Sequence, residues 1–92
     1  MSNMIYAFDY WKTLSHHKKV LLPLIEALVV ADHKVYIISA TGQNRKETTP
    51  EAINVIGLPK EVTVFMCIWE DQLEAPRIKY EKCKELSVDI FF

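Results

Sequence analysis

Short apolar runs separated by amphipathic or polar segments set the pattern of this chain. Residues 4–8 form a nearly continuous apolar run, which is typical of a strand buried on both faces. Three later runs rich in β-branched and aromatic residues predict further strands at 34–39, 62–67 and 88–92. The chain therefore carries four predicted strands, spaced widely enough for a helix between each pair.

Three helices are predicted in those intervals. Apolar residues recur at helical spacing over 20–31, where Pro23 is tolerable in a first turn and Asp32 marks the end. Thr49-Pro50-Glu51 predicts a helix start with a hydroxyl N-cap, and Gly57 its end. Pro76 opens a third helix that reaches about Leu86.

Strands that alternate with helices indicate a parallel sheet covered by right-handed crossovers. The sequence therefore predicts an α/β fold: a small three-layer Rossmann-like domain with a parallel sheet of about four strands and crossover helices. Residues 1–92 show no internal repeat and no second domain, so we expect a single domain.

The charge balance excludes several function classes. A formal net charge of −1 gives no electrostatic footprint for nucleic acid or an anionic membrane surface. The 20–31 run is too short to span a bilayer and contains Pro23 and Glu26. The first residues lack a basic segment before an apolar core, so no signal peptide is evident. We expect a cytoplasmic protein without a membrane anchor.

Two groups of potential metal ligands have simpler interpretations. Cys67 and Cys83 lack a CxxC spacing, and reduced cysteines in or near the core are favoured over a disulfide or a metal site. His16 and His17 are adjacent and have no third ligand nearby in sequence, so a solvated turn is favoured over a metal site.

Polar residues follow the predicted strands where the strands end. Asp9 and Thr13 follow the first strand, and Ser39 and Thr41 end the second. Lys79 lies in the first turn of the last helix. Because the carboxyl ends of parallel strands share one edge of the sheet, these groups are expected to converge at a ligand crevice.

A carboxylate, hydroxyls and an ammonium at one place suit a phosphoryl group, as nucleophile, hydrogen-bond donors and counter-charge. Each residue also has a structural alternative. Asp9 can cap the following turn, Ser39 can be a turn residue, and Lys79 can be one solvated lysine among many.

The order of these residues resembles the haloacid dehalogenase-like (HAD) superfamily of phosphatases and phosphotransferases. That family opens with a strand and Asp-x-Asp-x-Thr, here Asp9-Tyr10-Trp11-Lys12-Thr13. Its second motif, a Ser or Thr ending the second strand, matches Ser39 in the segment 35–42. Its third, a lysine before a helix, matches Lys79. The resemblance covers essentially the whole chain and implies a HAD-like core with Asp9 as nucleophile and Thr13, Ser39, Thr41 and Lys79 around the phosphate.

The chain departs from that family at two places that matter for catalysis. The second Asp, which the resemblance implies is the general acid and base, is replaced by Trp11, and the next residue is Lys12. The acidic pair of the fourth motif, which implies a Mg²⁺ site, would follow residue 92. Asp9 alone is a poor site for Mg²⁺. We therefore expect no metal site, and we expect Lys12 to neutralise Asp9 as an ion pair.

These departures predict a degenerate phosphatase domain, a pseudoenzyme that acts mainly as a binding or regulatory protein. No cofactor is expected. The alternative is an active phosphatase or phosphotransferase on a phosphorylated small molecule, with Asp9 as nucleophile and Mg²⁺ as cofactor. A third interpretation is a regulator that binds a phosphorylated ligand without hydrolysing it.

The last strand predicts a protein contact. The segment 88–92 would form an exposed, very apolar sheet edge, which proteins avoid leaving bare. Either this C-terminal edge strand pairs in a homodimer or with a partner protein, or the polypeptide is a fragment. We favour pairing, with Tyr10, Trp11 and Trp69 as aromatic anchors near the same edge, although the same aromatics could be core residues.

Overall fold

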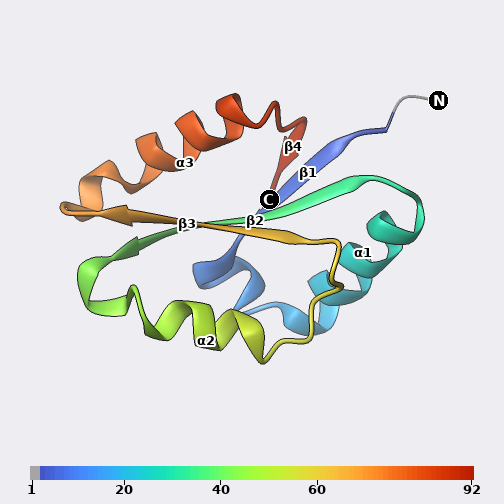
Figure 1. Ribbon diagram of the computed structural model, residues 1–92, viewed down its shortest axis with the longest axis horizontal. Coiled ribbons are helices and arrows are strands. Elements are labelled where there is room, and N and C mark those ends of the chain that lie inside the picture. Colours follow the sequence, from blue (N-terminus) through green and yellow to red (C-terminus); the bar gives the residue numbers. More distant parts are fainter. Residues whose placement is uncertain (1–2) are drawn as a thin grey trace.

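The computed structural model describes residues 3–92 and confirms the predicted α/β fold class. Four parallel strands form one sheet in the order β3-β2-β1-β4. The elements, in chain order (Figure 1), are β1 (Ile5–Asp9), α1 (Lys18–Val30), β2 (Lys34–Gly42), α2 (Thr48–Asn54), β3 (Thr63–Trp69), α3 (Ala75–Glu85) and β4 (Ile90–Phe91).

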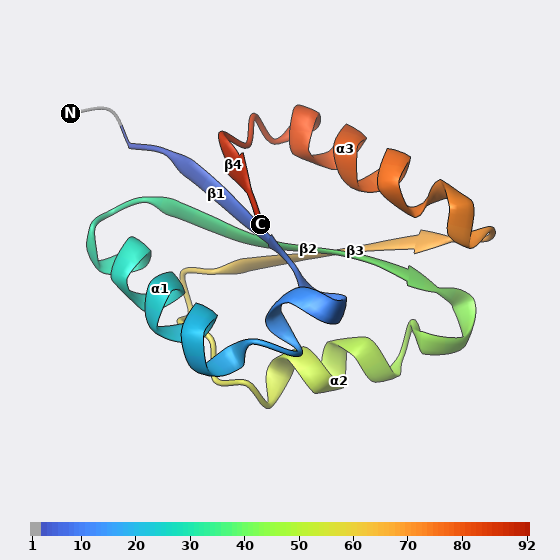
Figure 2. The same cartoon turned by 180° about the vertical axis from the view of Figure 1, so that it is seen from behind.

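The helices lie on both faces of the sheet. Figures 1 and 2 show α1 and α2 on one face and α3 alone on the other, which gives three layers. β1 lies between β2 and β4, so the sheet extends from the first strand in both directions. Among the described residues, no helix combines the length and apolar character needed to cross a membrane.

The hydrophobic core lies between the sheet and the α1/α2 layer. Because side chains alternate along a strand, every second residue of β2 from Val35 onward points to this layer. The fully or almost fully buried residues of the core cluster are Phe8, Tyr10, Leu14, Ile25, Val35, Ile37 and Ile53. This layer therefore excludes water from one face of the sheet.

The face under α3 is closed less completely. α3 packs on β2 and β3, but none of its own residues is fully buried. Tyr36 and Phe65 meet edge to face on this side, and the Lys82 ammonium lies 5.5 Å from the Phe65 ring centroid. Long amphipathic side chains thus cover much of the sheet here.

The start of α1 differs from the prediction. The helix begins at Lys18, so Pro23 lies inside it rather than in its first turn. Proline lacks the N–H that would bond to the carbonyl of Lys19, but both residues are exposed. The helix therefore tolerates Pro23 at its outer surface.

The predicted N-cap of the second helix is wrong. Glu47 occupies the cap position, and Thr49 lies inside α2, where it is completely buried. The helix ends at Asn54, before Gly57, which adopts a left-handed φ of 82° in the following turn. Gly57 thus serves the turn after α2 rather than the helix end itself.

The predicted strand bounds also shift. β2 and β3 continue to Gly42 and Trp69, beyond the expected ends, while β4 covers only Ile90 and Phe91. Parallel pairing between β2 and β3 runs as far as Gly42 opposite Trp69. The longer strands carry their last residues up to the rim where ligands bind in such sheets.

Candidate functional site

A five-residue turn, Tyr10–Leu14, follows β1 and shapes the rim of the sheet. It closes through a 2.9 Å hydrogen bond from the Ser15 N–H to the Tyr10 carbonyl. Trp11 is extended within this turn and Lys12 has a left-handed φ of 66°. The Lys12 N–H donates to Ser15 Oγ at 3.0 Å, which stabilises this uncommon conformation.

An ion pair joins the end of β1 to α3. Lys79 Nζ donates to Asp9 Oδ2 at 2.8 Å, across 70 residues of sequence. The two side chains are 17% (Asp9) and 23% (Lys79) exposed, so the pair is shielded but reachable. Lys79 reaches Asp9, as the sequence predicted. The predicted ion pair between Lys12 and Asp9 is not formed. Lys12 instead lies at the exposed surface.

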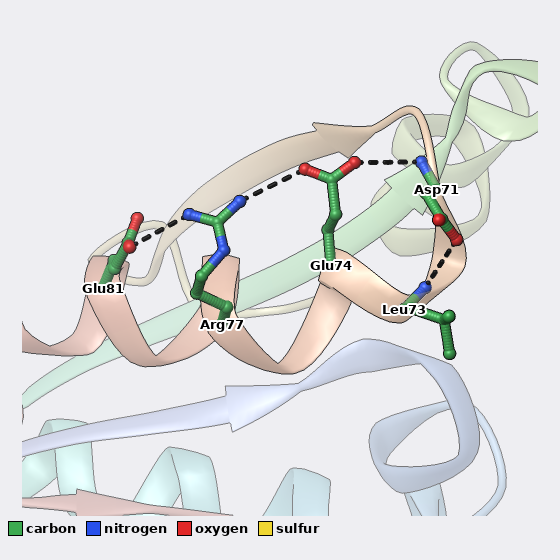
Figure 3. Close-up of polar contacts among 5 residues, drawn as sticks. All are labelled: Asp71, Leu73, Glu74, Arg77 and Glu81. Atoms are coloured by element: carbon green, nitrogen blue, oxygen red, sulfur yellow. Dashed lines mark hydrogen bonds and ion pairs between the residues drawn. The ribbon is translucent and has the colours of Figure 1, made fainter.

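A hydrogen-bonded cap fixes the start of the segment that carries Lys79. The Asp71 carboxylate accepts from the Leu73 N–H at 3.0 Å, and the Glu74 carboxylate accepts from the Asp71 N–H at 3.2 Å. Figure 3 shows how Arg77 extends this network by bridging Glu74 and Glu81. Such a capping box sets where the chain enters the helix, and therefore which residue faces Asp9 one turn later.

A cavity of about 560 Å³ opens at the carboxyl ends of β1, β2 and β3. We call it the strand-end cavity. It is lined by residues from all three strand ends, the loops that follow them and α3: Asp9, Trp11, Lys12, Thr13, Ala40, Thr41, Gly42, Asn44, Arg45, Trp69, Gln72, Ala75 and Lys79. The predicted convergence of strand ends thus produces a real concavity.

The two residues expected at the end of β2 are placed differently from each other. Thr41 lines the strand-end cavity, although it is only 2% exposed. Ser39 is completely buried on the α1/α2 side, and its Oγ lies 3.0 Å from Thr41 Oγ1. Ser39 therefore contacts Thr41 through a hydrogen bond and does not line the strand-end cavity.

Trp11 occupies the position two residues after Asp9 and is held among polar and aromatic groups. The Arg45 guanidinium lies over its ring, 4.8 Å from the centroid, and Tyr10 meets it edge to face at 4.9 Å. Its Nε1–H is buried without a hydrogen-bond partner among the described residues. An unpaired buried donor is costly, so this N–H lowers the stability of the turn.

Sequence reasoning missed several residues of the cavity. Asn44, Arg45 and Gln72 follow strand ends and line it, and they could have been found by the rule that identified Thr41. Trp69 was expected near the edge formed by the C-terminal strand. The observed order puts β3 at the opposite edge of the sheet from β4, and Trp69 lines the strand-end cavity instead.

The donor set at this site does not suit Mg²⁺. Among residues 3–92, Asp9 is the one carboxylate that lines the strand-end cavity, and its Oδ2 is already paired with Lys79. Over the same range no cluster of three or more His, Cys, Asp or Glu side chains could hold a metal ion. Mg²⁺ binds through oxygen ligands in near-ideal octahedral geometry, which one lysine-paired carboxylate serves poorly.

The two thiols lie away from this chemistry. Cys67 and Cys83 are both free and half-buried. Burial raises the pKa of Cys67, with a smaller opposing effect from the Lys82 ammonium, and burial also raises the pKa of Cys83. Thiols whose pKa is raised are poor nucleophiles at neutral pH, as expected of structural cysteines.

No protein-family model, curated protein or solved structure matches this chain. The case for a function therefore depends on the site itself.

Proposed function

We propose that this domain binds a phosphorylated ligand in the strand-end cavity without hydrolysing it efficiently, as a degenerate HAD-like phosphatase domain. The observation that carries the proposal is the 2.8 Å pair of Lys79 and Asp9 at the carboxyl end of β1, inside a cavity also lined by Lys12 and Arg45. The domain would then act by binding this ligand or in regulation, not mainly by catalysis.

The charge of the cavity favours an anion. Among the described residues its lining carries three cationic side chains, Lys12, Arg45 and Lys79, against the single carboxylate of Asp9. Guanidinium groups bind phosphate through two parallel hydrogen bonds, and lysine adds a point charge. Thr13 and Thr41 supply hydroxyls at the same rim. A dianionic phosphate would thus exchange solvent for several charge-assisted hydrogen bonds.

Turnover is not favoured, because the position suited to proton transfer holds Trp11. An indole cannot act as general acid or base, and losing such a group costs roughly 10²–10⁴-fold in rate. A further loss of several kcal/mol of charge stabilisation follows if no divalent cation is held. Asp9 is also engaged with Lys79, which reduces its availability as a nucleophile.

Phosphate titration followed by NMR tests the proposal. We expect inorganic phosphate to shift amide signals of Thr13, Thr41 and Lys79 in a saturable way. Lys79→Met should weaken binding about tenfold or more, because a charge-assisted hydrogen bond is lost. Lys84→Met, an exposed lysine of the same helix that does not line the cavity, is the matched control. Binding that is absent, or equally weakened by both substitutions, would contradict the proposal.

The alternative function is phosphoryl transfer with Asp9 as nucleophile. It is favoured by the carboxylate at a strand end beside a lysine, an arrangement that suits attack on a phosphomonoester. Hydrolysis of p-nitrophenyl phosphate with added Mg²⁺, compared between the unmodified protein and Asp9→Asn, distinguishes the two. Activity that Asp9→Asn abolishes would replace the binding function by the enzymatic one.

A protein contact at the β4 edge is the second part of the proposal. β4 ends the strand order, and Ile90, Phe91 and Phe92 are each about 40% exposed. Apolar edge strands tend to pair with another chain, so we infer that a second copy or a partner protein adds to the sheet here. Light scattering should give the mass of a dimer for the purified protein, and Ile90→Lys should give a monomer.

A further inference from the structure

We propose that the phosphorylated ligand carries a planar aromatic ring, so that the strand-end cavity takes an aromatic phosphomonoester rather than phosphate alone. This inference rests on the proposed function, which supplies the phosphate end, and it adds the organic part of the ligand. It is carried by the aromatic groups and the size of the same cavity.

Both tryptophans of the chain line this one cavity. Trp11 comes from the turn after β1 and Trp69 from the end of β3, on the far side of β2. Partly exposed indoles in a concave site offer broad apolar faces on which a flat ring can stack. Neither residue belongs to the buried core cluster, although Trp11 packs against it.

The backbone makes room for one of these indoles. Gly42 lies opposite Trp69 in the sheet register, and a Cβ built at Gly42 would stand 2.9 Å from Trp69 Cη2 and 3.1 Å from Cζ2. Any other residue would have to displace the ring. The missing side chain thus leaves room for the Trp69 ring beside the end of β2, where the cavity opens.

The other indole already accepts a planar group. The Arg45 guanidinium, on an exposed residue, lies over Trp11 at 4.8 Å. An aromatic ring can take that place and leave Arg45 free to bond to the phosphate. One wall of the cavity therefore offers a ring contact and a cation together.

The size of the cavity agrees with this ligand class. Its volume of about 560 Å³ lies within the range of about 300–1,000 Å³ that encloses whole small organic ligands. A phosphate ion alone would leave most of that space to water. A phosphomonoester with a ring would occupy more of the cavity than phosphate does and would bring a flat apolar face to the indoles that line it.

Two pairs of ligands test the inference by calorimetry on the full chain, and in each pair only one ligand has an aromatic ring. The pairs are adenosine 5′-monophosphate with ribose 5-phosphate, and phenyl phosphate with inorganic phosphate. Quenching of the intrinsic fluorescence provides a local readout, since both tryptophans report on this cavity. We expect the two aromatic esters to bind about tenfold or more tightly than their ring-free counterparts and to quench the signal. The tighter of the two identifies the ring as a nucleobase or a directly esterified aryl group.

The failures are distinguishable. Equal affinity for all four ligands would overturn the aromatic inference and leave phosphate binding standing. No measurable binding of any ligand would overturn the proposed function and the inference with it.

Substitutions then assign the contact to the indoles. Trp69→Leu should reduce the preference for the aromatic ester about tenfold while leaving ribose 5-phosphate affinity unchanged. Trp11→Leu, which keeps Trp69 as the fluorescence reporter, provides a second test if the first variant folds poorly. Tyr80→Leu removes an exposed aromatic of α3 outside the cavity and is the control. A preference that persists in both tryptophan variants would overturn the inference.

Discussion

The two faces of the sheet differ in what they contribute to the molecule. Under α1 and α2 the side chains form a closed apolar core in which Phe8, Ile25 and Ile37 are completely buried. Under α3 no helix residue is fully buried, and the ion pair of Lys79 and Asp9 lies at the rim. Most of the buried side chains therefore lie on one face, although Ala7 and Ile38 are buried beneath α3, and the ion pair lies at the rim of this second face.

Alternation along β1 makes this separation possible with few residues. Phe8 points into the core and stacks on Phe92 at 4.6 Å, while the next residue, Asp9, meets Lys79 on the opposite face. The side chains of neighbouring residues thus serve folding and binding through different side-chain partners, while the Asp9 N–H donates to the Phe92 carbonyl at 2.9 Å. Substitutions on either face should then be separable in their effects, and this can be tested.

The largest expected effect comes from opening the closed face. Phe8→Ala removes a completely buried ring and should lower the free energy of unfolding by about 3–5 kcal/mol, through lost burial and the cavity that remains. Urea unfolding followed by circular dichroism measures this change. Such a loss is a large fraction of the stability of a domain this small.

Ile78→Ala provides the comparison on the α3 side. Its side chain is only partly buried, so the loss should be well below that of a core isoleucine, about 1 kcal/mol. Equal losses for the two variants would show that both faces support the fold alike, and the contrast drawn here would be wrong.

The next effect falls on the rim of the open face. Gly42→Ala places a Cβ 2.9 Å from Trp69 Cη2 and 3.0 Å from Asn44 Oδ1, so the indole must move. We expect a loss of about 1–3 kcal/mol, as for overpacking, together with a shift in tryptophan emission. Differential unfolding and emission spectra measure the two consequences.

Gly57→Ala separates crowding from backbone strain. Gly57 has a left-handed φ of 82° and nothing within 4 Å of an added Cβ. The Gly57→Ala variant should lose about 1–2 kcal/mol of the free energy of unfolding, because alanine is strained at a left-handed φ, and its tryptophan emission should be unchanged. An emission shift in this variant, or none in Gly42→Ala, would contradict the placement of Trp69.

Periodicity and strand-end chemistry predicted the layout of the sheet, since both are local consequences of the sequence. Four apolar runs predicted the strands, and polar residues at two strand ends and in the last helix predicted that Asp9, Thr41 and Lys79 are neighbours. That prediction works because all strands in the sheet are parallel, so their carboxyl ends meet at one rim.

Side-chain partners and exact burial could not be predicted in the same way. The choice of Lys79 over Lys12 as the partner of Asp9 depends on where α3 lies and on the turn that exposes Lys12. The burial of Ser39 depends on β2 continuing to Gly42, because the longer strand moves Thr41, not Ser39, to the rim. Both facts arise from tertiary packing, which single-residue patterns do not encode.

The ion pair itself should contribute modestly to stability. Asp9→Asn or Lys79→Met leaves one partly shielded charge without its partner, so each should cost about 1–2 kcal/mol, between the values for exposed and buried pairs. The double variant should cost less than the sum of the two, and urea unfolding of all four proteins measures the coupling. Strictly additive losses would show that the pair contributes nothing and that Lys79 is held by its helix alone.

The smallest effect is a pH dependence that comes from the thiols under α3. Because burial raises the pKa of Cys67 and Cys83, the folded state holds their protons at pH values where the unfolded chain has begun to release them. Stability from these groups is therefore complete below the ordinary thiol pKa of about 8.5 and is lost as pH rises through the folded values.

Unfolding at neutral and alkaline pH should accordingly show a shallower loss of stability in the Cys67→Ala/Cys83→Ala variant than in the unmodified protein. Lys82, whose pKa is raised chiefly by its hydrogen bond to Glu85, is present in both proteins, so the comparison separates the thiols from it. If the two proteins lost stability equally, α3 would not desolvate these thiols. The helix would then shield the sheet from water even less than the partial burial of its own residues indicates. The difference in burial between the two faces of the sheet would be larger than described.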